Sequence, residues 1–223
     1  MLERIVIDKA VEELRPDVVV LAMTAHGLVN GPSDAVTTDW LAMAAKGAAQ
    51  GAQDPHLDAW RDAYRAFGAK PQRTRPSVDA LLRRADALPA INKVVDAYNA
   101  VSVEYVLPVG GEDLDAYRGP ARLVRATGEE PFDTMAGGAA AVEHPDAGEV
   151  VWRDDAGVTC RRWNWRQCTR TRITETTGNA LFLLERLAPY PLDRLEEAAG
   201  DLAERLRAIT PDVRIESRLI GGA

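Results

Sequence analysis

The sequence has few cysteines, no long hydrophobic run and none of the common catalytic motifs. Cys160 and Cys168 are the only cysteines among 223 residues, and the three histidines stand far from them, so the spacing does not support a zinc site. No run of about 18 apolar residues exists, which excludes a membrane-spanning helix. The patterns GxGxxG after a strand, GxxxxGK[ST], HExxH and GxSxG are also missing. We therefore expect neither a metal nor another cofactor.

The first residues lack the pattern of a secretion signal. The charges of Glu3, Arg4, Asp8 and Lys9 interrupt the stretch in which a signal peptide has its apolar centre. We expect a cytoplasmic location, where the two cysteines stay free thiols rather than forming a disulfide.

The net charge of −7 argues against a protein that binds any nucleic acid, because phosphate contacts need lysine and arginine. The basic residues are nevertheless concentrated in two segments, 61–75 and 160–172. The acidic residues gather elsewhere, above all in the C-terminal stretch 192–204. A basic face on an acidic body is therefore compatible with the sequence.

Hydrophobic periodicity predicts helices in the first half of the chain and strands in the second, which favours an α+β fold. Thr37 or Thr38 is expected to cap one helix, and Ser77 another. The expected early elements are a strand at 17–25, helices at 37–50, 55–68 and 77–88, a helix running into a strand over 91–107, and a turn region at 108–120. The expected later elements are strands at 121–127, 149–154, 158–165, 171–177 and 179–187, a helix at 191–209 and a strand at 213–220.

Two stretches carry a resemblance to a known family: "RPSVDALLRRADALPAINKVVDAYNAVSVEYVLPVGGEDLD" (75–115) and "GEVVWRDDAGVTCRRWNWRQCTRTRITETTGNALFLLE" (148–185). Together they resemble a free-standing B3/B4 domain, the module found inside the β subunit of phenylalanyl-tRNA synthetase. In the synthetase this module hydrolyses tyrosine mischarged onto phenylalanine tRNA. The resemblance covers about residues 60–187 and implies a single α+β, B3/B4-like domain over residues 1–223, with mixed β-sheet layers and flanking helices.

The spacing of single residues supports the resemblance. The synthetase module has D-x-x-N, then a Glu, a Pro and an Asp, which correspond here to Asp96, Asn99, Glu104, Pro108 and Asp113.

Two departures concern the editing chemistry itself. The synthetase has a histidine two residues after its proline, where this chain has Gly110. The glycine-rich turn and the editing acid that follows it are replaced by "RRWNWRQCTR", with no acid between Asp155 and Glu175. The editing residues are therefore not retained, and the sequence leaves open whether the chain is an enzyme.

The candidate site combines the resemblance with residue chemistry. Strand alternation over 161–166 predicts that Arg162, Asn164 and Arg166 share one face and that Arg161, Trp163 and Trp165 share the other. The predicted pocket residues are Asp96, Asn99, Pro108, Gly110, Gly111, Arg162, Asn164, Arg166, Thr174, Glu175 and Thr176.

Each of these predictions has a structural alternative. Asp96 and Asn99 also fit a cap or a buried hydrogen-bond network, and the arginines also fit an ion-paired sheet face rather than RNA contact. Trp163 and Trp165 are better interpreted as core or pocket wall than as platforms for stacking bases. Ser77 lacks a nearby histidine that could activate it, so we interpret it as a helix cap rather than a nucleophile.

Three interpretations of function follow. The first is an RNA-associated protein that binds tRNA, or another RNA, and deacylates a mischarged amino acid in trans. The second is a non-catalytic binder of a free amino acid or related small metabolite in the former editing pocket, which the two departures favour. A third, a protein-interaction module, ranks last. The residues of segment 161–167 either change the shape of the former editing pocket or fill it, and we expect a pocket of changed shape.

Overall fold

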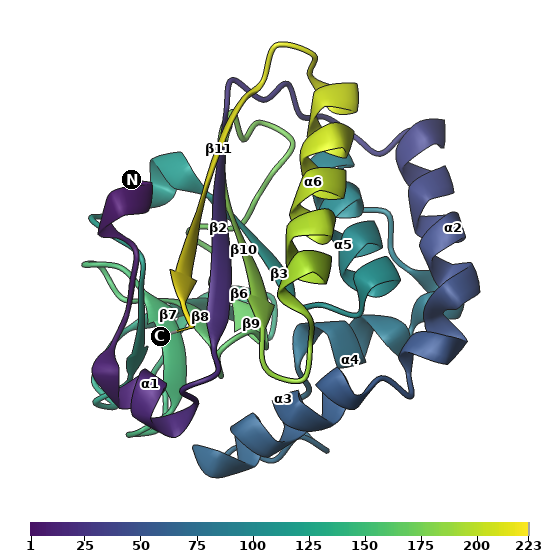
Figure 1. The fold of residues 1–223 in the computed structure, drawn as a ribbon. Coiled ribbons are helices and arrows are strands. Elements are labelled where there is room, and N and C mark those ends of the chain that lie inside the picture. The colour runs from purple at the N-terminus through teal and green to yellow at the C-terminus, as the bar shows by residue number, and fades with distance from the viewer. Residues whose placement is uncertain (223) are drawn as a thin grey trace.

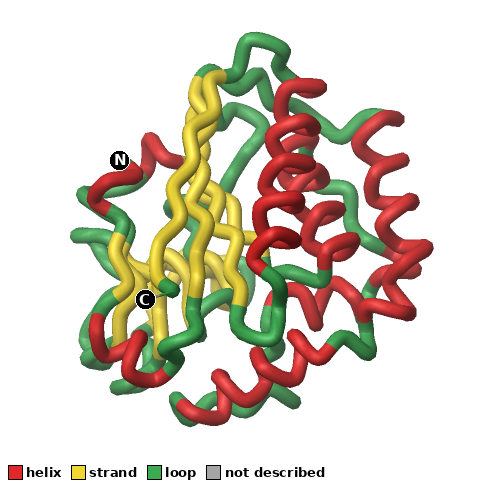
Figure 2. The backbone as a smooth tube through the Cα atoms, viewed as in Figure 1, coloured by secondary structure: helices red, strands yellow, loops and turns green. Residues whose placement is uncertain are grey.

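Two β-sheets face one another, and helices cover the outer face of one of them (Figures 1 and 2). The structure is a computed structural model that describes residues 1–222, with Gln50 described by its backbone only. The helices are α1 (Lys9–Leu14), α2 (Ala35–Gly51), α3 (Pro55–Ala66), α4 (Ser77–Leu82), α5 (Lys93–Tyr105) and α6 (Leu192–Ile209), with 3-10 turns at Leu2–Arg4, Ala85–Ala87 and Leu114–Ala116. The strands are β1 (Val6–Ile7), β2 (Val19–His26), β3 (Val109–Asp113), β4 (Arg122–Arg125), β5 (Phe132–Ala136), β6 (Ala139–Glu143), β7 (Val150–Arg153), β8 (Val158–Arg161), β9 (Arg166–Gln167), β10 (Asn179–Arg186) and β11 (Arg214–Gly221).

The larger sheet has the strand order β1-β4-β7-β8-β9, in which β1 pairs parallel to β4 and the other pairs are antiparallel. The second sheet is antiparallel, with the order β11-β2-β10-β3. The strands β5 and β6 form a separate hairpin. This mixture of helices and sheets confirms the α+β class.

The central strand β2 has a core on each face. Its alternate residues Val19, Leu21 and Met23 pack towards α5 and α6, whereas Val20 and Ala22 join the core between the two sheets. Helix α2 packs on the outside of α5 (Figure 1). A strand buried on both faces needs an almost continuous apolar sequence, which explains why its position at 17–25 was predictable.

Several predicted elements are confirmed, namely the strand at 17–25, the helix at 55–68, the C-terminal helix and the last strand. The two predicted helix caps are wrong. The amide of Thr37 donates to Asp34 Oδ1, so Asp34 caps α2. Ser77 is the first residue of α4 and makes no capping bond.

The boundary between α5 and β3 also differs from the prediction. The β-branched residues up to Val103 stay helical, because burial against α2 and the four-stranded sheet outweighs their strand propensity. Pro108, Gly110 and Gly111, expected in a turn, lie just before or within β3. Gly111 fits this strand because a Cβ atom there would lie 2.6 Å from Tyr98 Cε1.

The predicted strand over 158–165 breaks after Arg161, and the one over 171–177 is a loop with a single bridge from Arg172 to Glu112. The hairpin of β5 and β6 was not expected. Within residues 1–222 no helix is both long and apolar enough to cross a membrane. The single-domain organisation and the cytoplasmic location stay predictions.

Candidate functional site

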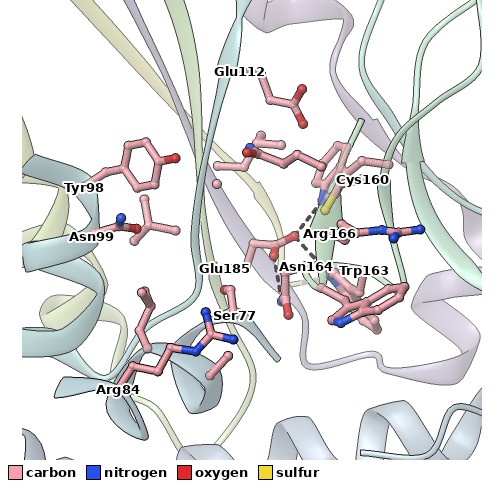
Figure 3. Close-up of a pocket in the computed structure, with 18 of the residues that line it drawn as sticks. Ser77, Arg84, Tyr98, Asn99, Glu112, Cys160, Trp163, Asn164, Arg166 and Glu185 are labelled. Atoms are coloured by element: carbon pink, nitrogen blue, oxygen red, sulfur yellow. Dashed lines mark hydrogen bonds between the residues drawn. The ribbon is translucent and has the colours of Figure 1, made fainter. Parts of the chain in front are cut away.

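A cavity of about 230 Å³ lies between α4, α5, β3, β10 and the hairpin that joins β8 to β9 (Figure 3). Its apolar wall is formed by Ala80, Leu81, Pro89, Tyr98, Val109, Trp152, Trp163, Trp165 and Leu183. Its polar lining consists of Ser77, Arg84, Asn99, Glu112, Asn164, Arg166, Gln167 and Glu185. An apolar hollow with a few polar groups directed into it is the usual form of a small-molecule site.

Glu185 is the central polar group of this cavity. It is 2% exposed, and it lies on the same face of β10 as Leu183. Its Oε1 atom accepts hydrogen bonds from Trp152 Nε1 at 2.7 Å and Trp163 Nε1 at 3.1 Å, and its Oε2 atom accepts one from Asn164 Nδ2 at 2.9 Å. All three partners are neutral donors. Burial raises the pKa of Glu185 to about 7, although the three donors favour the charged form.

The orientation of Asn164 is set from its other side. The buried Tyr64 hydroxyl of α3 donates to Asn164 Oδ1 at 2.9 Å, so the amide NH₂ group faces Glu185. Tyr64, Asn164 and Glu185 thus form a chain of hydrogen bonds from helix α3 to the cavity. Such a network fixes the carboxylate in one position.

The hairpin loop 162–165 has an unusual backbone. Arg162 and Trp163 have φ angles of 47° and 69°, in the left-handed region that costs a non-glycine residue about 1 kcal/mol or more. The amide of Arg162 donates to Glu149 Oε1 at 2.9 Å, and that of Trp163 to the Val150 carbonyl at 2.6 Å. The Trp163 ring also packs on Trp60 with a centroid distance of 5.2 Å. The predicted alternation over 161–166 is therefore wrong, because tertiary contacts hold a tight turn in place of a strand.

Two polar groups at the cavity have unused bonding capacity. The Ser77 hydroxyl oxygen is shielded from solvent and has no hydrogen-bond partner. Arg84 is exposed, and Figure 3 shows it reaching from the α4 side towards the region where Glu185 lies. A ligand with an oxygen acceptor would satisfy both groups.

Glu112 is a second buried carboxyl group, on the same face of β3 as Gly110. The Thr171 hydroxyl donates to Glu112 Oε2. Burial raises the pKa of Glu112 to about 8, so this group is largely protonated at neutral pH. The cavity is therefore lined by one carboxyl group that is mostly neutral and one that is close to half ionised.

Four of the predicted site residues line the cavity: Asn99, Gly110, Asn164 and Arg166. Arg166 contributes to the wall while its guanidinium group pairs with Glu143 at 2.7 Å. Gly110 leaves open space, since a Cβ atom there would have only Gln167 Nε2 within 4 Å, at 3.9 Å.

The remaining predicted residues do not line the cavity. Asp96 is fully buried and accepts hydrogen bonds from Thr37 Oγ1 at 3.0 Å and the Ile91 amide at 2.8 Å, which is the buried-network alternative. Pro108 lies just before β3, and its carbonyl accepts a hydrogen bond from the Glu185 amide. Gly111 lies within β3, and its carbonyl accepts one from Gln167 Nε2.

Thr174, Glu175 and Thr176 are exposed in the loop before β10. Glu185 lies at the far end of that strand, about 20 Å away at the usual rise per residue. The three residues therefore do not reach the cavity, and their predicted place in the pocket is not supported.

Arg162 lines a different hollow, described below, and Arg161 and Arg170 of its segment are ion-paired. Arg161 bonds to Glu149 with Nε at 3.0 Å and Nη2 at 2.8 Å, and Arg170 bonds to Asp154 at 2.8 Å. The ion-paired alternative thus describes these two arginines. Trp163 is core and cavity wall at once.

The sequence reasoning missed Glu185, Glu112, Ser77 and Arg84 as cavity residues. Glu185 ends an apolar run, where a single acid amid residues that face a core was the available signal. Nothing in the spacing distinguished Glu112 from the neighbouring acids at 113 and 115.

Two comparisons with known proteins found a match. The sequence pattern of the family described as B3/4 domain matches residues 59–198. The fold is similar, with a TM-score of 0.48 and 13% identity, to the crystal structure of an N-terminal fragment of the phenylalanyl-tRNA synthetase β-subunit from Pyrococcus horikoshii. The alignment covers 95% of this chain and 49% of that fragment, so the chain spans about half of its length. No curated protein matches the sequence. Because the family pattern covers more than half of the residues, the chain belongs to the B3/4 domain family.

Proposed function

We propose that the cavity binds the aminoacyl group carried by a tRNA, with the Glu185 carboxylate receiving the α-ammonium group. The observation that carries this proposal is the isolation of Glu185. Its hydrogen-bond partners are two indoles and one amide, none of which neutralises its charge. A buried carboxylate without a cationic partner is costly, and a cationic ligand group would offset that cost.

The side chains of Ser77 and Arg84 suit an ester. The Ser77 hydroxyl has no partner in the chain, and Arg84 lies at the rim. Both can donate to the carbonyl oxygen of an aminoacyl ester, and donors at that oxygen stabilise the negative charge that develops during hydrolysis. The arrangement therefore favours hydrolysis of the ester by water, with the amino acid and the free tRNA end as products.

The tRNA as carrier is supported by membership of the B3/4 domain family and by the motif spacing shared with the synthetase module. The chain does not retain the histidine and the acid of that module, so its amino-acid specificity is its own. A cavity of about 230 Å³ is of a size that suits an amino acid.

The decisive experiment compares aminoacyl-tRNAs with their N-acetylated forms. Acetylation removes the ammonium charge and leaves the ester and the RNA intact. We expect hydrolysis or binding of at least one aminoacyl-tRNA, and a loss of about tenfold or more when its α-amino group is acetylated. Equal activity on both forms would contradict the role of Glu185.

Glu185→Gln provides the matched variant. Glutamine keeps the acceptor for the two indoles, and its amide is accommodated if Asn164 turns over and donates to the Tyr64 hydroxyl. The variant thus removes the charge with little change of shape. It should lose discrimination between acetylated and free α-amino groups.

A second candidate function is binding of a free amino acid without catalysis. Arg84 favours it, because its guanidinium group would pair with the carboxylate of a free amino acid whose ammonium group meets Glu185. A thermal-shift screen with the free amino acids tests this candidate. Stabilisation by one amino acid, together with no turnover of any aminoacyl-tRNA, would select the second function over the first.

A further inference from the structure

A second hollow lies beside the cavity, beyond the contact between Phe67 and Trp163. Trp163 lines the cavity and Phe67 lines the second hollow, with ring centroids 6.4 Å apart. This hollow, the groove, has a volume of about 530 Å³ and is lined by Phe67, Gly68, Ala69, Lys70, Arg73, Thr74, Asp146, Ala147, Glu149 and Arg162.

Two segments contribute residues to both the groove and the cavity. The chain from α3 to the end of α4 lines the groove up to Thr74 and the cavity from Ser77 onwards. The hairpin loop lines the groove with Arg162 and the cavity with its next residues. The contact of Phe67 with Trp163 separates the two hollows, so a ligand longer than the cavity would have to pass this contact to reach the groove.

The groove carries uncompensated positive charge. Lys70 and Arg73 are exposed and form no ion pair with any residue that the structure describes. Of the two acids there, Glu149 is 2% exposed and its carboxylate is held by Arg161. The other, Asp146, lies 3.8 Å from Arg162, which offsets its charge.

This charge is local and runs against the net charge of −7. Residues 61–84 contain seven basic residues and two acids, and both acids are already ion-paired. The basic residues are Arg61, Arg65, Lys70, Arg73, Arg75, Arg83 and Arg84.

We propose that the groove binds the phosphate backbone of the RNA strand whose aminoacylated end occupies the cavity. This inference rests on the proposed function and assigns the polymer part of the ligand to Lys70 and Arg73. An RNA strand fits better than an acidic peptide, because the exposed cations of Lys70 and Arg73 lie in an open groove and the adjoining cavity takes one amino-acid-sized end group.

The test measures binding of deacylated bulk tRNA by fluorescence anisotropy between 50 and 200 mM salt. The groove variant is Lys70→Ala with Arg73→Ala, and the control is Arg207→Ala with Arg214→Ala, which removes two exposed arginines from α6 and β11. The groove variant should bind about tenfold more weakly at the lowest salt. Its log–log salt slope should fall by about 1 to 2, as expected for two lost phosphate contacts. The control should stay within about twofold of the wild type.

Equal weakening by both variants, or no weakening by the groove variant, would overturn the assignment. Competition by poly-glutamate as strong as that by tRNA would transfer the groove to an acidic peptide. Deacylated tRNA carries no aminoacyl group, so this result does not depend on Glu185. If Glu185→Gln leaves the preference for a free α-amino group unchanged while the groove variant weakens tRNA binding, the proposed function fails and the groove assignment stands.

Discussion

Replacing Glu185 with glutamine is expected to remove a pH dependence of stability that its buried charge causes. The folded protein raises the pKa of this carboxyl group from 4.5 to about 7 through burial. At a pH between 4.5 and about 7, the folded chain binds more protons at this group than the unfolded chain does. The stability therefore falls as the pH rises through this window, and the loss is complete once the pH exceeds the folded-state pKa.

The size of the effect follows from the two pKa values. A tenfold change in proton affinity corresponds to about 1.4 kcal/mol, so ionised Glu185 lowers the free energy of unfolding by about 3 kcal/mol in total. Roughly 2 kcal/mol of this is expressed between pH 5 and pH 8, because the unfolded carboxyl group is already mostly ionised at pH 5. Glu185 is fully buried, so salt screens little of this effect.

Urea unfolding at pH 5, 6, 7 and 8 measures the prediction directly. The free energy of unfolding should decline more in the wild type than in the Glu185→Gln variant, by about 2 kcal/mol over this range. Glu112, whose pKa is raised to about 8, is present in both proteins, so its contribution cancels in the difference. Parallel pH profiles would show that Glu185 is not an uncompensated buried charge, and would remove the basis for an ammonium partner.

Further predictions concern the cavity wall and one thiol. Gly110→Ala should leave thermal stability nearly unchanged and weaken ligand binding, because its Cβ atom enters open space within the cavity. Gly111→Ala should lower the free energy of unfolding by about 1 to 3 kcal/mol, since its Cβ atom would lie 2.6 Å from Tyr98 Cε1, as urea unfolding would show. Trp152→Phe removes one donor to Glu185, so the midpoint of ligand binding against pH should move upwards. Cys168, which is 1% exposed and whose thiol pKa is raised by burial, should react with a thiol reagent only as fast as the chain unfolds.

The elements that sequence reasoning located are those whose burial pattern repeats along the chain. The strand at 17–25 and the amphipathic helix at 55–68 carry their pattern in consecutive residues. The end of α5 carries no such pattern in its consecutive residues, because Val101 and Val103 are helical only through contacts with other elements. Local propensity gives no information on such contacts, so the prediction placed the change to strand too early.

The candidate site was predictable only where its residues lie in sequence motifs. Asn99 and Gly110 followed from the spacing shared with the synthetase module, and both line the cavity. The residues 174–176 were assigned to the pocket for the chemistry of their polar side chains, whereas they are exposed in a loop. Glu185 was not assigned to the pocket because its significance depends on three donors, and one of them, Trp152, is 33 residues away.

The segment 161–167 lines the cavity without filling it. The Trp163 ring packs against Trp60 in the core, and Arg161 turns to Glu149, so neither occupies the hollow. What the hairpin gives to the cavity is chiefly bonding to Glu185, through Trp163 and Asn164. The neighbouring Arg162 lines the groove, so this four-residue loop would contact both parts of the ligand proposed to span the two hollows. A change in this loop should therefore alter RNA affinity and recognition of the ammonium group together, whereas a change at Lys70 or Glu185 alters only one of them.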